Sequence, residues 1–308
     1  MKTSQTVEEL SARYGAPGRI VFRPGHKGRP VAVLANRYGV AEVALLGANT
    51  LSYRPTGHAP VLFSSPEHPY NRADEVHGGI PVCWPQFGRL AIPGMVPHGF
   101  ARILLFEVRG TKYSEEMTEL TLGVAADANT RALWPHDFDL ELTVTLSMKL
   151  TLKLVTKNTG TEPFAFTCGL HPYFNVRERE RVVLKGFDGL DYVNAADMST
   201  GTQSGDLPVT RALDHVFALA AQPKHEFALL DQGLERAIAI VSSGNANEVV
   251  WNPGDACTFK DLPPDAARHF VCVEPVSSWP KAVRELGPGE THELLVAIQS
   301  TLPDASAK

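Results

Sequence analysis

A run of sixteen residues, 140–155, reads LELTVTLSMKLTLKLV and places an apolar side chain at every second position. Successive side chains of a β-strand point to opposite faces, so this period predicts strands with one buried and one solvated face. A single strand of this length would be unusual, and we therefore expect a bend or tight turn at 147–149. The predicted buried set is Leu140, Leu142, Val144, Leu146, Met148, Leu150, Leu152 and Leu154.

Short strand-like segments separated by Gly, Pro and Asn continue through most of the chain, and only residues 7–15 suggest a short amphipathic helix, ended by Gly15. Many short strands without helical periodicity are typical of a sandwich or barrel. No linker or internal repeat divides the sequence. We predict one all-β domain over residues 1–308, with residues 1–20 peripheral and 303–308 a frayed tail.

Composition narrows the range of partners. The chain has 34 acidic and 29 basic side chains, a formal charge of −5, and no Lys/Arg cluster interleaved with aromatics. Nucleic acid is therefore not expected as a partner. No apolar run approaches the ~18 residues of a membrane span, and the first residues carry no signal-peptide core. We expect a cytoplasmic protein with no membrane partner and no obligate protein partner.

The metal and cofactor motifs that would signal other chemistries are missing from the sequence. Cys83, Cys168, Cys257 and Cys272 form no C-x-x-C pair, and none of the 11 histidines stands in an H-x-H arrangement. No phosphate-binding or dinucleotide-binding glycine motif is present either. We therefore expect reduced, buried cysteines, and catalysis without a metal or other cofactor.

Two loops carry polar groups in rigid settings. Residues 77–88, HGGIPVCWPQFG, combine glycines, prolines and aromatics, which suits either a pocket wall or a packed Ω-like loop. Residues 97–102, PHGFAR, place His98 and Arg102 on either side of a tight turn. These two side chains would offer donors to one ligand, with arginine suited to a carboxylate or phosphate. Alternatively, they make a turn cap and a surface ion pair.

Two strand ends carry titratable groups. In TCGLHPYFNV, residues 167–176, His171 precedes Pro172, where a ladder should lose a hydrogen bond. His171 is either a hydrogen-bonded wall residue or a functional group. In FVCVEP, residues 270–275, Glu274 closes an apolar strand and is either salt-bridged at the rim or desolvated, with a raised pKa. Together they would supply an acid and a base near neutral pH.

Six segments resemble, in order, those of the hexose-6-phosphate mutarotases, or glucose-6-phosphate 1-epimerases, of the galactose-mutarotase-like superfamily. The segments are HGGIPVCWPQFG, PHGFAR, TCGLHPYFNV, ALDHVF, VVWNP and FVCVEP, between residues 77 and 275. The resemblance implies a β-supersandwich that binds a sugar or sugar phosphate across one sheet. It also implies that His171 protonates the ring oxygen while Glu274 takes the proton of the anomeric hydroxyl, opening the C1–O5 bond. Rotation about C1–C2 and reclosure then give the other anomer.

The same resemblance assigns secondary roles. His98 and Asp214 would hold sugar hydroxyls, Arg102 would lie at the site, and Trp84 and Gln86 would line it. His77 stands where the family usually has an arginine that grips the 6-phosphate, and His215 stands where it usually has a second cation. The chain would therefore act on unphosphorylated aldoses, or use Arg72, Arg89 or Arg102 for the phosphate. A catalytically silent sugar-binding protein is the alternative from another class.

Overall fold

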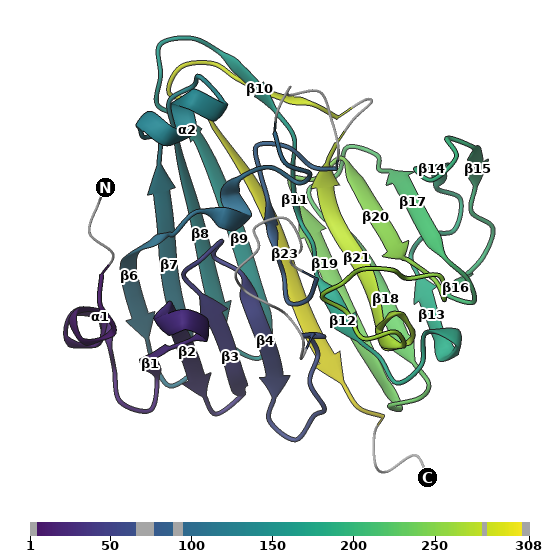
Figure 1. Ribbon diagram of the computed structural model, residues 1–308. Coiled ribbons are helices and arrows are strands. Elements are labelled where there is room, and N and C mark those ends of the chain that lie inside the picture. The colour runs from purple at the N-terminus through teal and green to yellow at the C-terminus, as the bar shows by residue number, and fades with distance from the viewer. Residues whose placement is uncertain (1–4, 66–76, 89–94, 279–281, 304–308) are drawn as a thin grey trace.

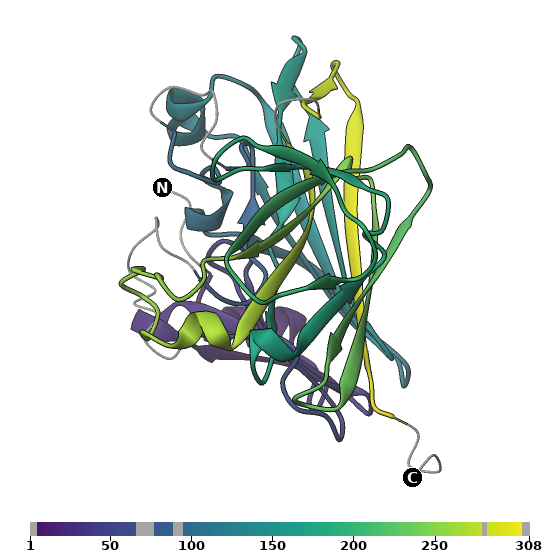
Figure 2. The same ribbon diagram turned by 90° about the vertical axis from the view of Figure 1, so that its right-hand side faces the viewer.

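Two large antiparallel sheets make up most of the computed structural model, which describes residues 5–65, 77–88, 95–278 and 282–303. Figure 1 shows the two sheets, and Figure 2 shows the same molecule turned by 90° about the vertical axis. One core cluster joins side chains of both sheets, among them Leu142, Ile240 and Val273. The all-β prediction is thereby confirmed.

The nine-stranded sheet carries the longest strands. In spatial order it contains β16 (Leu207–Pro208), β13 (Val182–Lys185), β18 (His225–Asp231), β19 (Arg236–Ser243), β23 (Thr291–Thr301), β9 (Leu150–Asn158), β8 (Phe138–Leu146), β7 (Thr118–Ala125) and β6 (Glu107–Tyr113).

The eight-stranded sheet has shorter strands. It contains, in order, β15 (Thr200–Thr202), β14 (Asp191–Asn194), β17 (Leu213–Ala218), β20 (Asn247–Asn252), β21 (Phe270–Ser277), β11 (Cys168–Leu170) and β5 (Val82–Cys83), with β12 (Tyr173–Asn175) also paired to β21.

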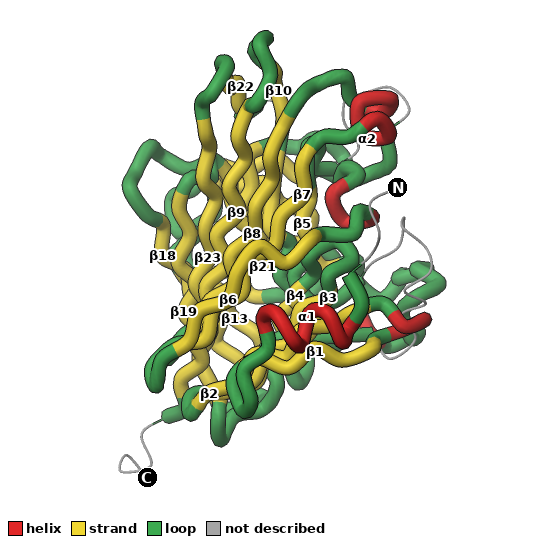
Figure 3. The backbone as a smooth tube through the Cα atoms, turned by 90° about the vertical axis from the view of Figure 1, so that its left-hand side faces the viewer, coloured by secondary structure: helices red, strands yellow, loops and turns green. Residues whose placement is uncertain are grey.

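Smaller elements complete the fold. The remaining strands form a four-stranded sheet of β1 (Ile20–Pro24), β2 (Pro30–Asn36), β3 (Gly39–Ala44) and β4 (Thr50–Pro55), and a pair of β10 (Phe164–Phe166) and β22 (Arg284–Leu286). The described helices longer than one turn are α1 (Val7–Tyr14) and α2 (Ala128–Leu133). Figure 3 shows α1 beside β1, against which it packs.

The turn predicted within residues 140–155 is confirmed. β8 ends at Leu146, β9 begins at Leu150, and the Ser147 N–H donates to the Lys149 carbonyl over 2.9 Å. Both strands alternate buried and half-buried side chains along most of their length. Met148 was expected in the buried set, but it is 61% exposed because it lies at the tip of the turn.

The helix expected at residues 7–15 is α1, and Gly15 is its C-cap. Thr6 and Glu9 form a capping box at its start. Although residues 1–20 were expected to be peripheral, Leu10 of this helix is fully buried in the core. The expected frayed tail, beyond residue 303, lies outside the described residues.

All four cysteines are free thiols, as predicted. Cys83, Cys168 and Cys272 are buried, whereas Cys257 is half-buried. None of the described helices is long and apolar enough to cross a membrane. The cytoplasmic location stays a prediction.

Candidate active site

His171 lies opposite Glu274 because one strand register continues across a break in the ladder. β11 and β12 lie on either side of this break, and both pair antiparallel with β21. The paired residues are Gly169 with Val276 before the break and Tyr173 with Cys272 after it. Because the register is the same on both sides, residue 171 comes opposite residue 274, and opposed side chains point to the same face. Pro172 therefore stands in the gap and interrupts neither strand.

The two side chains form a close, buried pair. His171 Nε2 lies 3.4 Å from Glu274 Oε2, and the residues are only 8% and 1% exposed. The His171 ring stacks on Tyr173, with centroids 4.7 Å apart and planes 6° from parallel. Trp251 meets the same ring edge-on at 5.8 Å. An imidazole and a carboxyl are thus held against an aromatic wall.

The register also places Asp214 on this side of the sheet, which we call the site face. Cys272 pairs with Trp251 on β20, and Trp251 pairs with Asp214 on β17. Asp214 therefore points to the same side as Glu274. Its burial raises the pKa of the Asp214 carboxyl to about 6.

Electrostatics favour one proton on the pair. Burial lowers the pKa of His171 well below its ordinary value, and the nearby His98, His77 and Arg102 add to this effect. Burial raises the pKa of Glu274 well above its ordinary value, and Asp214 contributes by like-charge repulsion. Near neutral pH these directions favour a neutral imidazole beside a protonated carboxyl, so the pair holds one proton.

Two loops bring His98 beside this pair. The His98 N–H donates to the Gly88 carbonyl over 2.8 Å, and the Gly88 N–H donates to His98 Nδ1 over 3.4 Å. His98 has a φ of 62°, an uncommon conformation for a residue other than glycine. Its ring centroid lies 5.6 Å from that of His171. The structure therefore brings His98 together with His171 and Glu274, as the resemblance implied.

Arg102 and Gln86 come from the same two loops, and both are buried. Arg102 lies in a single 3₁₀ turn, Ala101–Ile103, close enough for its charge to help lower the pKa of His171. Gln86 donates through Nε2 to the Gly88 carbonyl at 3.5 Å. Arg72 and Arg89 lie outside the described residues.

Trp84 lies in the core between the sheets and not beside the pair. It is fully buried, with its ring centroid 4.4 Å from Phe138 and 5.2 Å from Trp134. The preceding Cys83 packs with Val249 on the site face, and consecutive side chains of an extended chain alternate. Trp84 therefore packs in the core, on the face of the sheet opposite His171 and Glu274.

His77 is held by an aspartate that sequence reasoning missed. Its Nδ1 lies 2.8 Å and 2.9 Å from the two carboxylate oxygens of Asp261, and its backbone N–H donates to the same carboxylate over 3.1 Å. Burial alone would raise the pKa of Asp261, but these bonds from His77 outweigh it and lower the pKa. Because an ionised carboxylate can only accept, His77 carries a proton on Nδ1, and Nε2 of the neutral ring is an acceptor.

His215 does not replace the second cation. It follows Asp214 in β17, so its side chain points to the opposite face of the sheet. There it is buried and stacks on Tyr192, with centroids 4.1 Å apart. Its burial lowers the pKa, which favours a neutral ring.

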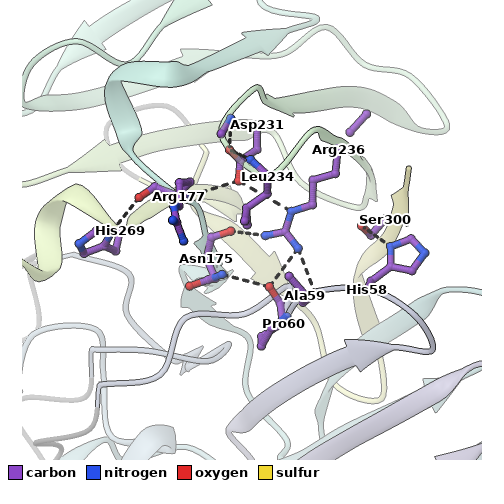
Figure 4. A network of polar contacts seen from close by, with 12 residues as sticks. His58, Ala59, Pro60, Asn175, Arg177, Asp231, Leu234, Arg236, His269 and Ser300 are labelled. Atoms are coloured by element: carbon purple, nitrogen blue, oxygen red, sulfur yellow. Dashed lines mark hydrogen bonds and ion pairs between the residues drawn. The ribbon is translucent and has the colours of Figure 1, made fainter. Parts of the chain in front are cut away.

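A buried arginine ties the end of β12 to a neighbouring loop (Figure 4). Arg236 donates from Nη1 to the carbonyls of Ala59 and Pro60, over 3.1 Å and 3.0 Å, and from Nη2 to the carbonyl of Asn175. Its Nε lies 3.8 Å from a carboxylate oxygen of Asp231. This arginine fixes the strand that carries Tyr173, the stacking partner of His171.

Solved structures share this architecture. One described as a "putative mutarotase", from Salmonella typhimurium, is 29% identical, with a TM-score of 0.84 over 92% of this chain and 94% of that chain. A galactose 1-epimerase from Lactobacillus acidophilus NCFM, at 14% identity, shares the fold, with a TM-score of 0.70 over 92% and 98% of the two chains. The expected galactose-mutarotase-like β-supersandwich is confirmed, and the fold is that of mutarotase-type sugar isomerases.

Sequence comparison gives the family. The model of the aldose 1-epimerase family matches residues 30–299. A relative from Escherichia coli K12, named "Putative glucose-6-phosphate 1-epimerase", is 32% identical over 238 residues, which are 76% of this chain and 78% of the relative. The chain belongs to the aldose 1-epimerase family.

Proposed function

We propose that this protein interconverts the α and β anomers of a hexose 6-phosphate, with glucose 6-phosphate as the first candidate, through acid–base ring opening by His171 and Glu274. The observation that carries the proposal is the pair itself, an imidazole 3.4 Å from a carboxyl on one face of a sheet. The names of the relatives at 32% and 33% identity support the choice of substrate.

The reaction needs one proton delivered to the ring oxygen O5 and one removed from the hydroxyl on C1. The electron pair of the C1–O5 bond goes to O5, and a carbonyl forms at C1. In the unliganded site the pKa directions favour the proton on Glu274. Transfer of this proton to His171 creates the imidazolium that protonates O5 and the carboxylate that accepts the C1 proton. After rotation about C1–C2, the same steps in reverse close the ring.

Neighbouring polar groups would hold the sugar. In this proposal His98 and Asp214 bind hydroxyls, while Arg102 and Gln86 lie at the edge of the bound ring. His77 faces the substituent on C6, and Trp84 supports the site from the core. General acid–base assistance of this kind contributes typically ~10²- to 10⁴-fold to a rate.

The test is anomer exchange measured by NMR on glucose, galactose and glucose 6-phosphate in parallel. We expect His171→Asn and Glu274→Gln each to lower the exchange rate at least ~100-fold, because each keeps the shape and removes the proton function. Circular dichroism checks that both variants fold. A folded variant that turns over like the parent would remove that residue from the mechanism, and a parent that binds sugar without speeding exchange would support a silent binding protein.

A second candidate substrate, an unphosphorylated aldohexose, is favoured by the pairing of His77 with Asp261. With a neutral imidazole the pair carries one negative charge, and with an imidazolium it is neutral. Neither form supplies the permanent positive charge that a guanidinium offers to a phosphate. A kcat/KM for glucose above that for glucose 6-phosphate would select this candidate.

A further inference from the structure

Beside His171 and Glu274, the site face holds a third possible metal ligand, Cys272, which the proposed reaction does not use. Cys272 precedes Glu274 by two residues on β21, so both side chains point to the same face. The register places His171 opposite Glu274. Among the described residues, one ligand atom each from His171, Cys272 and Glu274 lies within 4.8 Å of the others, and all three residues are buried.

The geometry of this trio suits a tetrahedral ion. Two nitrogen or oxygen ligands of zinc, each about 2.0–2.2 Å from the metal, lie roughly 3.4 Å apart. His171 Nε2 and Glu274 Oε2 are 3.4 Å apart. Glu274 Oε2 nevertheless has no hydrogen-bond partner, so this contact is not a hydrogen bond. The Cys272 sulfur lies within 4.8 Å of both other ligand atoms, so side-chain rotation has only a short distance to close.

Charge and ligand softness select the kind of ion. A thiolate, a carboxylate and a neutral imidazole together balance the charge of a divalent cation, which matters in a buried site. Sulfur and imidazole ligands favour borderline-soft ions such as Zn²⁺ or Co²⁺, whereas Mg²⁺ and Ca²⁺ require oxygen ligands. Binding releases the thiol proton, and the proton of Glu274 where that carboxyl is protonated, so affinity increases with pH.

We propose that His171, Cys272 and Glu274 form an inhibitory site for a thiophilic divalent cation such as Zn²⁺. The ion bonds to the His171 lone pair and the Glu274 carboxylate, so neither group can exchange a proton with the sugar. The binding site stands on its geometry alone, while the inhibition rests on the proposed function. A tetrahedral ion held by three protein ligands would keep a fourth position for a water molecule.

Binding is tested with Co²⁺ as a spectroscopic probe on full-length protein dialysed against EDTA and then freed of chelator. We expect a thiolate-to-cobalt charge-transfer band that saturates at one Co²⁺ per chain. The band should vanish in Cys272→Ser and remain in Cys257→Ser, a matched change at the more accessible thiol. Mg²⁺ should not compete with Co²⁺, whereas Zn²⁺ should. Absence of the band in the parent, or its persistence in Cys272→Ser, would overturn the site.

Inhibition is tested by anomer exchange during titration with Zn²⁺. We expect the parent to lose activity and to recover it with EDTA. Cys272→Ser should keep its activity without metal and need at least ~10-fold more Zn²⁺ for half inhibition, where tenfold corresponds to ~1.4 kcal/mol of binding free energy. Cys272→Ala serves if the serine variant does not fold. A cobalt band without zinc inhibition would overturn both the inhibitory role and the assignment of His171 and Glu274 as the acid–base pair. Normal anomer exchange without any cobalt band would overturn the metal site alone.

Discussion

At the scale of single residues, Asp214 influences the acid–base pair without touching it. It lies on the site face two strands from Glu274, and its charge helps to raise the pKa of Glu274. In the proposed function the active pair holds one proton, so kcat/KM should fall on the alkaline side as Glu274 loses that proton. The acidic limb should lie below pH 6.5, because the pKa of His171 is lowered from this ordinary value.

We predict that Asp214→Asn moves the alkaline limb of the kcat/KM profile to lower pH. Removing a like charge lowers the pKa of Glu274, so its proton is lost earlier as pH increases. KM should also increase about 10-fold, as expected for losing a hydrogen bond to a charged group. Asp191→Asn, an exposed change on β14 of the same sheet, is the control and should leave the profile unchanged. An unshifted limb in Asp214→Asn would separate this carboxyl from the pair.

His77 decides the response to a phosphate group. We predict that His77→Arg raises kcat/KM for glucose 6-phosphate about 10- to 100-fold, because a guanidinium can bond Asp261 and still offer charged donors to the phosphate. Glucose lacks the phosphate, and its kcat/KM should change little. A parallel fall for both sugars would mean that residue 77 only packs its loop.

Sequence reasoning found His77 but not the aspartate that holds it. Asp261 takes the Nδ1 proton, and no local pattern links an aspartate in a loop to a histidine 184 positions earlier. Trp84 shows a second limit, since aromatic loop residues look alike whether they face a ligand or the core. Glu274 was easier to find, because a carboxylate after a run of apolar residues is unusual in any context. It was expected to close the strand, but it lies inside β21, which continues to Ser277.

At the scale of elements, long strands were predictable and short ones were not. The period of two over 140–155 identified β8 and β9 and the turn between them. β12 has three residues and follows a proline, so its sequence offers too few positions to show a period. Likewise, α2 has only six residues and was not foreseen. Their places are set by partners elsewhere in the chain, such as Arg236 for β12.

We predict that Arg236→Lys lowers the free energy of unfolding by about 2–4 kcal/mol. Lysine keeps the charge but carries its donors on one nitrogen, whereas the arginine reaches the carbonyls of Ala59, Pro60 and Asn175 through both Nη1 and Nη2. Buried bonds to charged groups are worth roughly 1.5–3 kcal/mol each. Urea unfolding measures the change. Arg131→Lys is the matched control, because its ion pair with Asp137 is exposed and such pairs contribute about 0–1 kcal/mol. Equal losses in both variants would contradict a special role for Arg236.

At the scale of the whole molecule, Glu248 bridges the two sheets. It lies on β20, is fully buried, and accepts hydrogen bonds from Ser242 on β19, over 3.1 Å, and from Asn245, over 2.9 Å. Its other oxygen, Oε1, has no hydrogen-bond partner. Burial raises the pKa of Glu248 to about 8, so the folded protein favours the protonated carboxyl.

We predict that Glu248→Gln stabilises the protein increasingly as pH rises from 4.5 to 8. The folded-state pKa lies above the ordinary value of 4.5, so the parent has its full stability below pH 4.5 and loses it as pH rises toward 8. The difference between variant and parent should grow by at most ~1.4 kcal/mol per pH unit. Urea unfolding of both proteins across this range measures it, and a pH-independent difference would show that Glu248 does not titrate there.

The overall class of fold followed from the sequence, but the pairing of its strands did not. Alternation tells which face of a strand is buried, whereas strand order depends on contacts between distant segments that composition does not encode. The resemblance to a known family supplied the supersandwich. The resemblance could not show that the ladder hydrogen bond lost at Pro172 falls in the gap between β11 and β12. These two strands pair with β21 in one continuous register.

Under the proposed function, that shared register makes catalysis a reporter of folding. The imidazole comes from the middle of the chain and the carboxyl from near its end, so the pair exists only after β21 has found β11 and β12. Contacts between such distant segments are slow to form, because a large loop must close before they contribute any stability. A chain that has formed its local hairpins, such as β8 with β9, is still inactive. Activity regained during refolding therefore marks the completion of these late pairings. Circular dichroism, which reports total strand content, would not resolve them.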